Sequence, residues 1–174
     1  PCALIYEKPG TILNSGRWLQ WRYQAVKPWG QAKTDLEMCD LLFKEIRALY
    51  EKEGGANPDP ILKCKWDYYL DGKVDFRVVA WALNGYNVKG TDLSKGKVDL
   101  VSGYAKLEAD GSTASGMWIY GGFYNNNKDP LNPAAQPIGR RDNKDNSTCG
   151  LYSNWAYSWP ANRRILYNRA SCDM

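Results

Sequence analysis

Residues 110–158 limit the possible folds of this chain more than any other stretch, because they show neither a helical nor a strand period. Gly, Asn, Ser and aromatic residues dominate this segment, as in GSTASGMWIYGGFYNNN, and only Met117–Tyr120 has the composition of a strand. Loops of this length without secondary structure of their own are uncommon in compact domains. We therefore expect the segment to lie over other parts of a larger protein.

The strongest helix signal covers residues 35–53. Thr34 and Glu37 fit a capping box, in which each side chain accepts a hydrogen bond from the other residue's backbone amide. A Gly-Gly pair ends the pattern. The helix carries one apolar face, made of Met38, Cys39, Leu42, Ile46 and Leu49. We expect this face to dock onto a core, with Cys39 as a small buried residue.

Short elements between turns are expected in the remainder of the chain. Residues 1–33 have loop character, because Pro-Gly, Asn-Ser-Gly and Pro-Trp-Gly turns interrupt them. The other expected elements are helices over 61–70 and 75–83, a turn or two over 99–107, and a short helix in PANRRILYNRAS that starts at Pro160. Asn84-Gly85 is expected to end the second of these helices as a left-handed cap.

The composition argues against several kinds of active site within the chain. There is no histidine, so an imidazole base, a Ser-His-Asp triad and the usual zinc site are excluded. The five cysteines contain no C-x-x-C pair, which argues against a cluster or zinc knuckle, and their odd number argues against a fully paired disulfide framework. The Gly-rich runs lack the strand, helix and lysine of a phosphate loop. No pair of carboxylates stands out as an acid–base couple.

Charge and hydropathy restrict the partners. The net charge is +4, and no Lys/Arg block of the kind that binds nucleic acid is present. No apolar run approaches the roughly 18 to 20 residues of a membrane-spanning helix. The chain begins at Pro1-Cys2 without an initiator Met or signal peptide, so we expect it to be an internal piece of something longer.

The run EKPGTILNSGRWLQWR has the features of a binding loop. Lys8 supplies a point charge for a phosphate or a carbonyl, Gly10 and Gly16 let a backbone approach closely, and Asn14 can pair with an amide. Asp35, at the predicted helix start, can accept two N–H bonds from a guanine edge. It can equally serve only to complement the helix dipole. The sequence leaves both roles of Asp35 open.

Eight Trp and twelve Tyr are a heavy aromatic load for this length. Most of them are expected to be buried packing, and a minority can stack on a ligand. One hypothesis is therefore a non-enzymatic module that binds a sugar or peptide through exposed aromatic side chains. That hypothesis explains the missing catalytic pairs but not the spacing of Lys8 and Asp35. Cooperative unfolding of the isolated chain would favour it.

The motifs also resemble a known family. EKPGTILNSGRWLQWR followed by GQAKTD resembles the segment that closes the third domain of molybdopterin-dependent oxidoreductases, where a loop with a lysine precedes a helix that opens on Asp. Lys8 and Asp35 stand 27 positions apart, which fits that pattern. NSGRWLQWR, EGGANPD, DGSTASGMWIY, GRRDN and WPANRRILYNRAS are similar to the large subunit of respiratory, periplasmic formate dehydrogenases, so the resemblance runs essentially end to end.

The resemblance implies an α/β fold class and a division of the chain. Residues 1–56 would be the end of a cofactor-binding α/β domain, 57–109 a helical insertion, and 110–174 an irregular segment leading to a C-terminal barrel domain. The implied reaction is oxidation of formate to carbon dioxide at tungsten or molybdenum, held by bis-molybdopterin guanine dinucleotide. Electrons would leave through 4Fe–4S clusters to an iron–sulfur subunit, and a cytochrome can be a further partner.

The resemblance also assigns roles to residues. In that family the metal ligand, its neighbouring histidine, the substrate arginine and the cluster cysteines all precede this segment, so no catalytic residue or metal ligand is expected within it. Lys8 and Asp35 match residues that contact one guanine dinucleotide. Arg17 and Trp18 match positions near the pterin or the substrate approach. Pro9 is a departure, because it stands where relatives often carry Glu and it removes a backbone donor beside Lys8.

Overall fold

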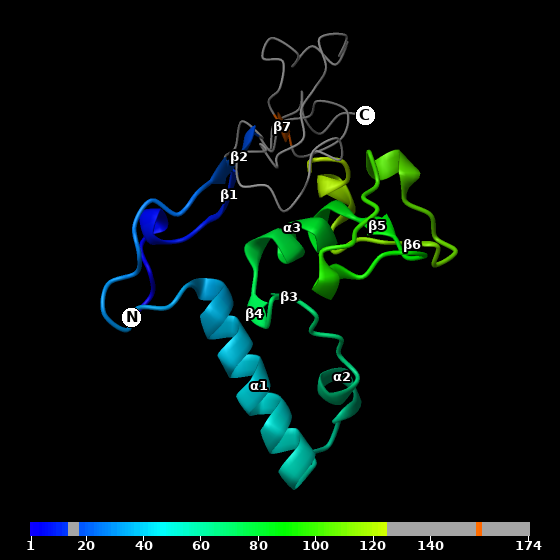
Figure 1. Cartoon of the computed structure of the whole chain (residues 1–174). Helices are drawn as coiled ribbons and strands as arrows, with labels where there is room; N and C mark the ends of the chain where they lie inside the picture. Colours follow the sequence, from blue (N-terminus) through cyan, green and yellow to red (C-terminus); the bar gives the residue numbers. More distant parts are fainter. Residues whose placement is uncertain (14–17, 125–155, 158–174) are drawn as a thin grey trace, which may run out of the picture.

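The structure of the chain is a computed structural model that describes residues 1–13, 18–124 and 156–157. Helices α1, α2 and α3 span Asp35–Glu53, Asp59–Leu62 and Phe76–Asn84, and 3-10 turns η1 to η4 span Ile5–Glu7, Leu93–Lys95, Tyr104–Lys106 and Trp118–Tyr120. Strands β1 to β7 span Gly10–Leu13, Trp18–Arg22, Tyr69–Leu70, Lys73–Val74, Tyr86–Asn87, Thr113–Ala114 and Ala156–Tyr157. Figure 1 shows these elements as a mixed α/β arrangement, which confirms the expected fold class at that level. The finer division into parts of three domains stays a prediction.

The opening run forms a strand pair, so the expectation of irregular structure throughout residues 1–33 is wrong. β1 pairs antiparallel with β2, with Gly10 opposite Arg22 and Leu13 opposite Leu19, and β7 pairs with the other edge of β2. The turn signals were given more weight than the two short runs Gly10–Leu13 and Trp18–Arg22, which are rich in strand formers. Gly10 has a φ of 145°, a backbone conformation that other residues rarely adopt, and it lies against the ring of Phe76.

The start and end of α1 agree with the sequence. The Thr34 hydroxyl accepts a hydrogen bond from the Glu37 amide at 3.2 Å, and the Glu37 carboxylate accepts one from the Thr34 amide at 2.7 Å. The capping box is therefore confirmed, and it supplies partners to amides that the first helical turn leaves without one. The helix ends at Gly54, whose φ is 71°. No helix in the described part of the chain is both long and apolar enough to cross a membrane.

A polar side of α1 attaches it to residues 62–69. The buried Asp40 carboxylate accepts hydrogen bonds from the Trp66 indole at 2.9 Å and from the Tyr69 hydroxyl. Phe43 stacks on the Trp66 ring with centroids 4.5 Å apart. The Arg47 guanidinium donates to the carbonyl of residue 62 at 2.6 Å. These contacts determine which side of α1 faces the rest of the described chain.

The apolar face of α1 does not dock onto a core formed by the described residues. Leu42, Leu49 and Met38 are exposed, and Cys39 is an exposed free thiol instead of a buried one. The expected core contact is therefore not made within the described residues, because hydrophobic spacing identifies an apolar stripe but not what covers it. Within the described residues, the opposite side of the helix makes the contacts.

The core of the described chain lies around α3. Val78 and Trp81 on this helix are fully buried. They belong to a cluster with Leu19, Leu70, Ala80, Leu100, Phe123 and Tyr124. Asn84, also fully buried, donates to the carbonyls of Gly85 at 2.9 Å and Val101 at 3.0 Å, and it accepts from the Tyr124 amide at 2.8 Å. One amide side chain therefore joins three separate segments.

Two expected elements differ in the structure. The helix predicted over 61–70 is wrong beyond Leu62, because Tyr69–Leu70 forms strand β3 and pairs with β4 across Asp71-Gly72. Asp71 has a φ of 51° and Gly72 a φ of 76°, as a two-residue type I′ hairpin requires. The strand predicted at Met117–Tyr120 is the 3-10 turn η4, in which the Tyr120 amide donates to the Met117 carbonyl at 3.0 Å.

The other expected elements agree or lie outside the described residues. The helix predicted over 75–83 is α3, shifted by one residue. Gly85 ends it, but its φ of 88° and ψ of 150° lie outside the left-handed helical region, so the expected left-handed cap is not formed. The turn expected within 99–107 is η3. The short helix expected from Pro160 lies outside the described residues.

Candidate functional site

The fold brings Lys8 and Asp35 together across 27 positions of sequence. The Lys8 ammonium forms an ion pair with the Asp35 carboxylate. The Cys2 thiol donates a hydrogen bond to the other carboxylate oxygen at 2.8 Å, and its sulfur lies 3.6 Å from the Lys8 nitrogen. The family resemblance assigns both residues to contact with one guanine dinucleotide, and that contact stays a prediction.

Backbone pairing explains how the two residues meet. The Ala3 amide donates to the Lys33 carbonyl at 2.7 Å, and the Lys33 amide donates to the Pro1 carbonyl at 3.1 Å, so the first residues lie beside the segment that enters α1. The carboxylate of Glu7 accepts from the Leu4 amide at 2.7 Å and closes the turn η1 directly before Lys8. The capping box then fixes Asp35 as the first residue of α1.

The electrostatics of the group keep both charges at neutral pH. Hydrogen bonds from Cys2 and Lys8 lower the pKa of the Asp35 carboxyl, and the hydrogen bond to Asp35 raises the pKa of Lys8. The same carboxylate raises the pKa of Cys2 and so favours the thiol over the thiolate. The Lys8 side chain is 13% exposed, whereas that of Asp35 is 62% exposed. Asp35 is therefore the member of the pair that an outside ligand reaches most easily.

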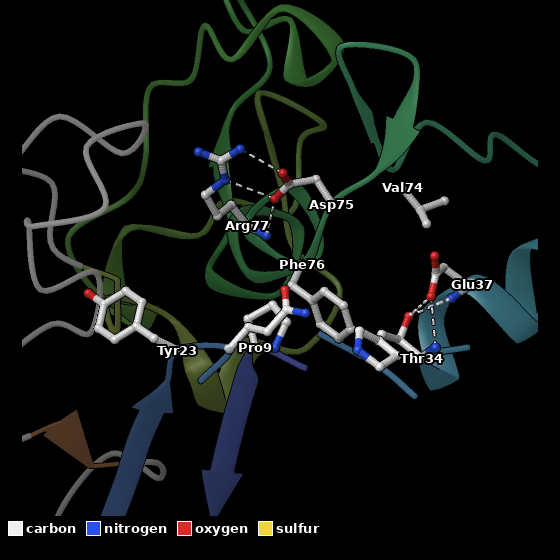
Figure 2. Close-up of a pocket in the computed structure, with 10 residues that line it drawn as sticks. Pro9, Tyr23, Thr34, Glu37, Val74, Asp75, Phe76 and Arg77 are labelled. Carbon is white, nitrogen blue, oxygen red and sulfur yellow. Dashed lines mark hydrogen bonds and ion pairs between the residues drawn. The ribbon is translucent and has the colours of Figure 1, made fainter. Parts of the chain in front are cut away.

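A pocket of about 450 Å³ lies next to this group. It is lined by Pro9, Tyr23, Gln24, Pro28, Thr34, Glu37, Val74, Asp75, Phe76 and Arg77. Figure 2 shows Asp75 and Arg77 at one end, the capping pair Thr34 and Glu37 at another, and Phe76 between them. Asp75 binds the Arg77 guanidinium through two bonds, of 2.9 and 2.6 Å. The polar groups at both ends thus already have partners within the chain.

The sequence did not identify Asp75, Arg77 or the Asp40 acceptor as special. Asp75 and Arg77 were assigned only to a helix, although an acidic residue directly before an apolar helical run is a recognised N-cap signal. The carboxylates of α1 were expected to be solvated, and Asp40 instead bonds two aromatic donors. Nothing in the spacing of Asp40 separates it from its exposed neighbours.

The two remaining predicted site residues are not tested by the structure. Arg17 lies outside the described residues. Trp18 opens β2, where it pairs with Tyr157 of β7. Their expected proximity to a pterin or a substrate path stays a prediction. Among the described residues, no group of three or more His, Cys, Asp or Glu side chains is arranged to hold a metal ion.

Fold and site together define a class: a mixed α/β segment that presents a charged pair at a helix N-terminus, with no metal-binding cluster in its described part. The chain is 39% identical over 179 residues to the formate dehydrogenase-O major subunit of Escherichia coli (strain K12), covering 99% of this chain and 17% of that subunit. It is 40% identical over 184 residues to formate dehydrogenase subunit alpha of Megalodesulfovibrio gigas, covering 100% of this chain and 17% of that subunit. No family model matches the chain.

A third relative is formate dehydrogenase 2 subunit alpha (cytochrome c-553) of Nitratidesulfovibrio vulgaris, which is 42% identical over 181 residues and is again covered over 17% of its length. The chain is therefore a homologue, along its whole length, of one segment of the formate dehydrogenase major, or alpha, subunits. It spans about a sixth of the length of these relatives, which are oxidoreductases. The family resemblance seen in the sequence is confirmed.

Proposed function

We propose that this chain is part of a formate dehydrogenase catalytic subunit. The whole enzyme would convert formate to carbon dioxide, one proton and two electrons, and pass the electrons to iron–sulfur clusters. The observation that carries the proposal is the end-to-end identity of 35 to 42% with formate dehydrogenase major and alpha subunits. A free-standing aromatic binding module is disfavoured, because the chain aligns from end to end with one segment of subunits about six times as long.

Within that enzyme, this segment would hold one nucleotide end of a bis-molybdopterin guanine dinucleotide and act as scaffold. When bound, the cofactor supplies the tungsten or molybdenum centre at which formate is oxidised. Asp35 fits the role of a guanine acceptor, because its carboxylate is 62% exposed and an aspartate oxygen pair can accept about four hydrogen bonds. Lys8 would donate to a phosphate or a carbonyl next to that edge. The reacting groups themselves would come from other parts of the subunit.

The proposed partners follow from the same homology. They are the remainder of the catalytic subunit, an iron–sulfur subunit that receives electrons through 4Fe–4S clusters, and a cytochrome in some assemblies. The names "major subunit" and "subunit alpha" describe members of multi-subunit enzymes, and one relative's name includes cytochrome c-553. A periplasmic location is proposed on the resemblance to periplasmic members alone.

The test uses the full-length subunit with Asp35→Asn, because an amide removes half of the acceptor capacity at nearly constant volume. We expect guanine nucleotide released by acid hydrolysis, and metal measured by mass spectrometry, to fall together with formate-dependent dye reduction. Asp59→Asn is the matched control, since Asp59 forms an exposed ion pair with Lys63 away from this group. Unchanged nucleotide content in Asp35→Asn would contradict the proposed contact.

A charge exchange separates a cofactor contact from an internal ion pair. The double variant Lys8→Asp with Asp35→Lys keeps opposite charges at the two positions. If the pair serves only to join the N-terminal segment to α1, this exchange should restore the nucleotide content lost in the single variants. If Asp35 accepts from the guanine edge, the exchange should not restore it, because a lysine donates hydrogen bonds and cannot accept them.

A further inference from the structure

An apolar stripe on α1 lies opposite the side chains through which the helix contacts residues 62–69. The α1 stripe consists of Met38, Leu42 and Leu49, which are 37%, 62% and 54% exposed. At 3.6 residues per turn, these three positions lie within about 40° of one another around the helix axis. They form one line along the helix instead of scattered exposed residues.

The opposite side of α1 carries the helix's attachments. Asp40, Phe43 and Arg47 bind residues 62–69 through hydrogen bonds and ring stacking. Figure 1 shows α1 at the edge of the described chain, with α2 beside its C-terminal end. The helix is thus held by its polar side while its most apolar side stays open.

This orientation is the reverse of the usual orientation of a surface helix in a complete folded protein. Amphipathic helices bury the apolar stripe and present the charged side to water. A continuous line of exposed Leu and Met side chains marks an interaction surface more often than a solvated one. The α1 stripe therefore indicates a surface that another part of the assembly covers.

The length of the chain's relatives indicates what could cover the stripe. The match takes up 17% of each relative, so most of the subunit that contains this segment lies outside the chain. A surface on the same polypeptide is present at a much higher effective concentration than one on a separate molecule. We propose that the α1 stripe packs on an apolar surface from the remainder of the same major subunit. Because the stripe begins three positions after Asp35, that packing would hold the candidate contact residue in place.

The proposal rests on homology and exposure and does not depend on cofactor contact by Lys8 or Asp35. It is tested in the full-length major subunit produced without partner subunits. Leu49→Cys and Ala48→Cys are a matched pair, because both positions are exposed in this chain and both fall in the tryptic peptide ALYEK, residues 48–52. Alkylation of each variant is followed by mass spectrometry in the native state and in denaturant.

The expected result is that Cys at position 49 reacts about tenfold or more slowly in the native subunit than in denaturant, because labelling then needs local opening. Cys at position 48 should react markedly faster than Cys at position 49 in the native subunit. Equal native and denatured rates at position 49 would overturn the proposal. Protection that appears only after adding the partner subunit, or only at high protein concentration, would overturn it too, in favour of a partner or a second copy.

A second pair of variants covers the case in which labelling is disturbed. Leu42→Glu places a charge in the stripe, and Ala48→Glu places the same charge on the same helix outside the stripe. We expect Leu42→Glu to reduce the yield of soluble subunit strongly, with Ala48→Glu close to wild type. Equal yields for the two variants would overturn the proposal, since a solvent-facing stripe tolerates a charge.

Discussion

The buried Asp40 carboxylate allows a quantitative prediction about how α1 is attached. It accepts hydrogen bonds from Trp66 and Tyr69, and its second oxygen pairs with the Lys44 ammonium at 2.8 Å. Burial raises the pKa of Asp40, but the hydrogen bonds from Lys44, Tyr69 and Trp66 outweigh it and leave the pKa below its usual value. The carboxylate is therefore charged at neutral pH, and its stabilisation is lost only as acid titrates it.

The magnitude follows from the bonds that each substitution removes. A hydrogen bond to a charged group contributes about 1.5–3 kcal/mol. Asp40→Asn keeps one carbonyl oxygen for the two aromatic donors but removes the negative charge they bond and the ion pair with Lys44, so we expect a loss of about 2 kcal/mol in the local stability of α1 against residues 62–69. Asp40→Ala leaves both donors without this acceptor, and we expect a loss of about 4 kcal/mol. The matched control Asp59→Asn removes an exposed ion pair, which contributes under about 1 kcal/mol.

Native-state hydrogen exchange in the full-length subunit measures these losses directly. Peptides from α1 and from residues 62–70 should exchange about 30-fold faster in Asp40→Asn than in wild type, because 1.4 kcal/mol corresponds to a factor of about ten. The increase in exchange rate should be larger in Asp40→Ala, and Asp59→Asn should exchange at nearly the wild-type rate. Indistinguishable exchange of these peptides in Asp40→Asn and Asp59→Asn would refute the proposed role of Asp40 in attaching α1 to residues 62–69.

Three further predictions concern the core around α3. Gly122 has a φ of 80°, and a Cβ there would lie 2.2 Å from the Ser102 carbonyl oxygen, so Gly122→Ala should destabilise the core by more than about 2 kcal/mol. The control Gly111→Ala, at a φ of 85° with no atom within 4 Å of the added Cβ, should lose only about 1 kcal/mol. Both losses are measured as hydrogen exchange of the α3 amides. Asn84→Ala leaves the Val101 carbonyl and the Tyr124 amide without their partner, and exchange at Tyr124 should rise about 30-fold or more. Burial raises the pKa of Tyr124 to about 12, whereas an unfolded Tyr titrates near 10, so the contribution of Tyr124 to stability should be constant below about pH 10 and fall as the pH rises towards 12. Tyr124→Phe should reduce that slope in denaturant titrations, and an unchanged slope would contradict the assignment.

Local signals were readable from the sequence because their physics is local. The capping box at Thr34 and Glu37 needs only residues three apart, and the structure reproduces it. The hairpin at Asp71-Gly72 was equally readable, since this dipeptide favours a type I′ turn, but the adjacent apolar residues were assigned to a helix. The pair Gly121-Gly122 could not be explained from the sequence, and the close backbone of Ser102 now explains why the second position needs glycine.

Long-range placement could not be read from spacing alone. The ion pair of Lys8 with Asp35 was not predicted, because it depends on backbone pairing between residue 33 and the first three residues. The contacts that α1 makes within the described chain were not identified from the sequence for a related reason. Hydrophobic periodicity finds an apolar stripe, but Asp40 bonds two aromatic donors that lie 26 and 29 positions away, and no periodic signal reports such partners.

The ion pair between Lys8 and Asp35 has a consequence for the ligand that can bind there. A simple anion would have to compete with Asp35 for the Lys8 ammonium, and a simple cation would have to compete with Lys8 for the carboxylate. A guanine edge carries adjacent N–H donors and a carbonyl acceptor, so it can bond the exposed carboxylate and the ammonium together. Such a ligand replaces the internal contact without leaving either charge unpaired, and an unpaired charge is the costly outcome at a partly buried site. The preformed pair therefore favours a ligand of mixed donor and acceptor character over a bare phosphate, in agreement with the proposed nucleotide contact.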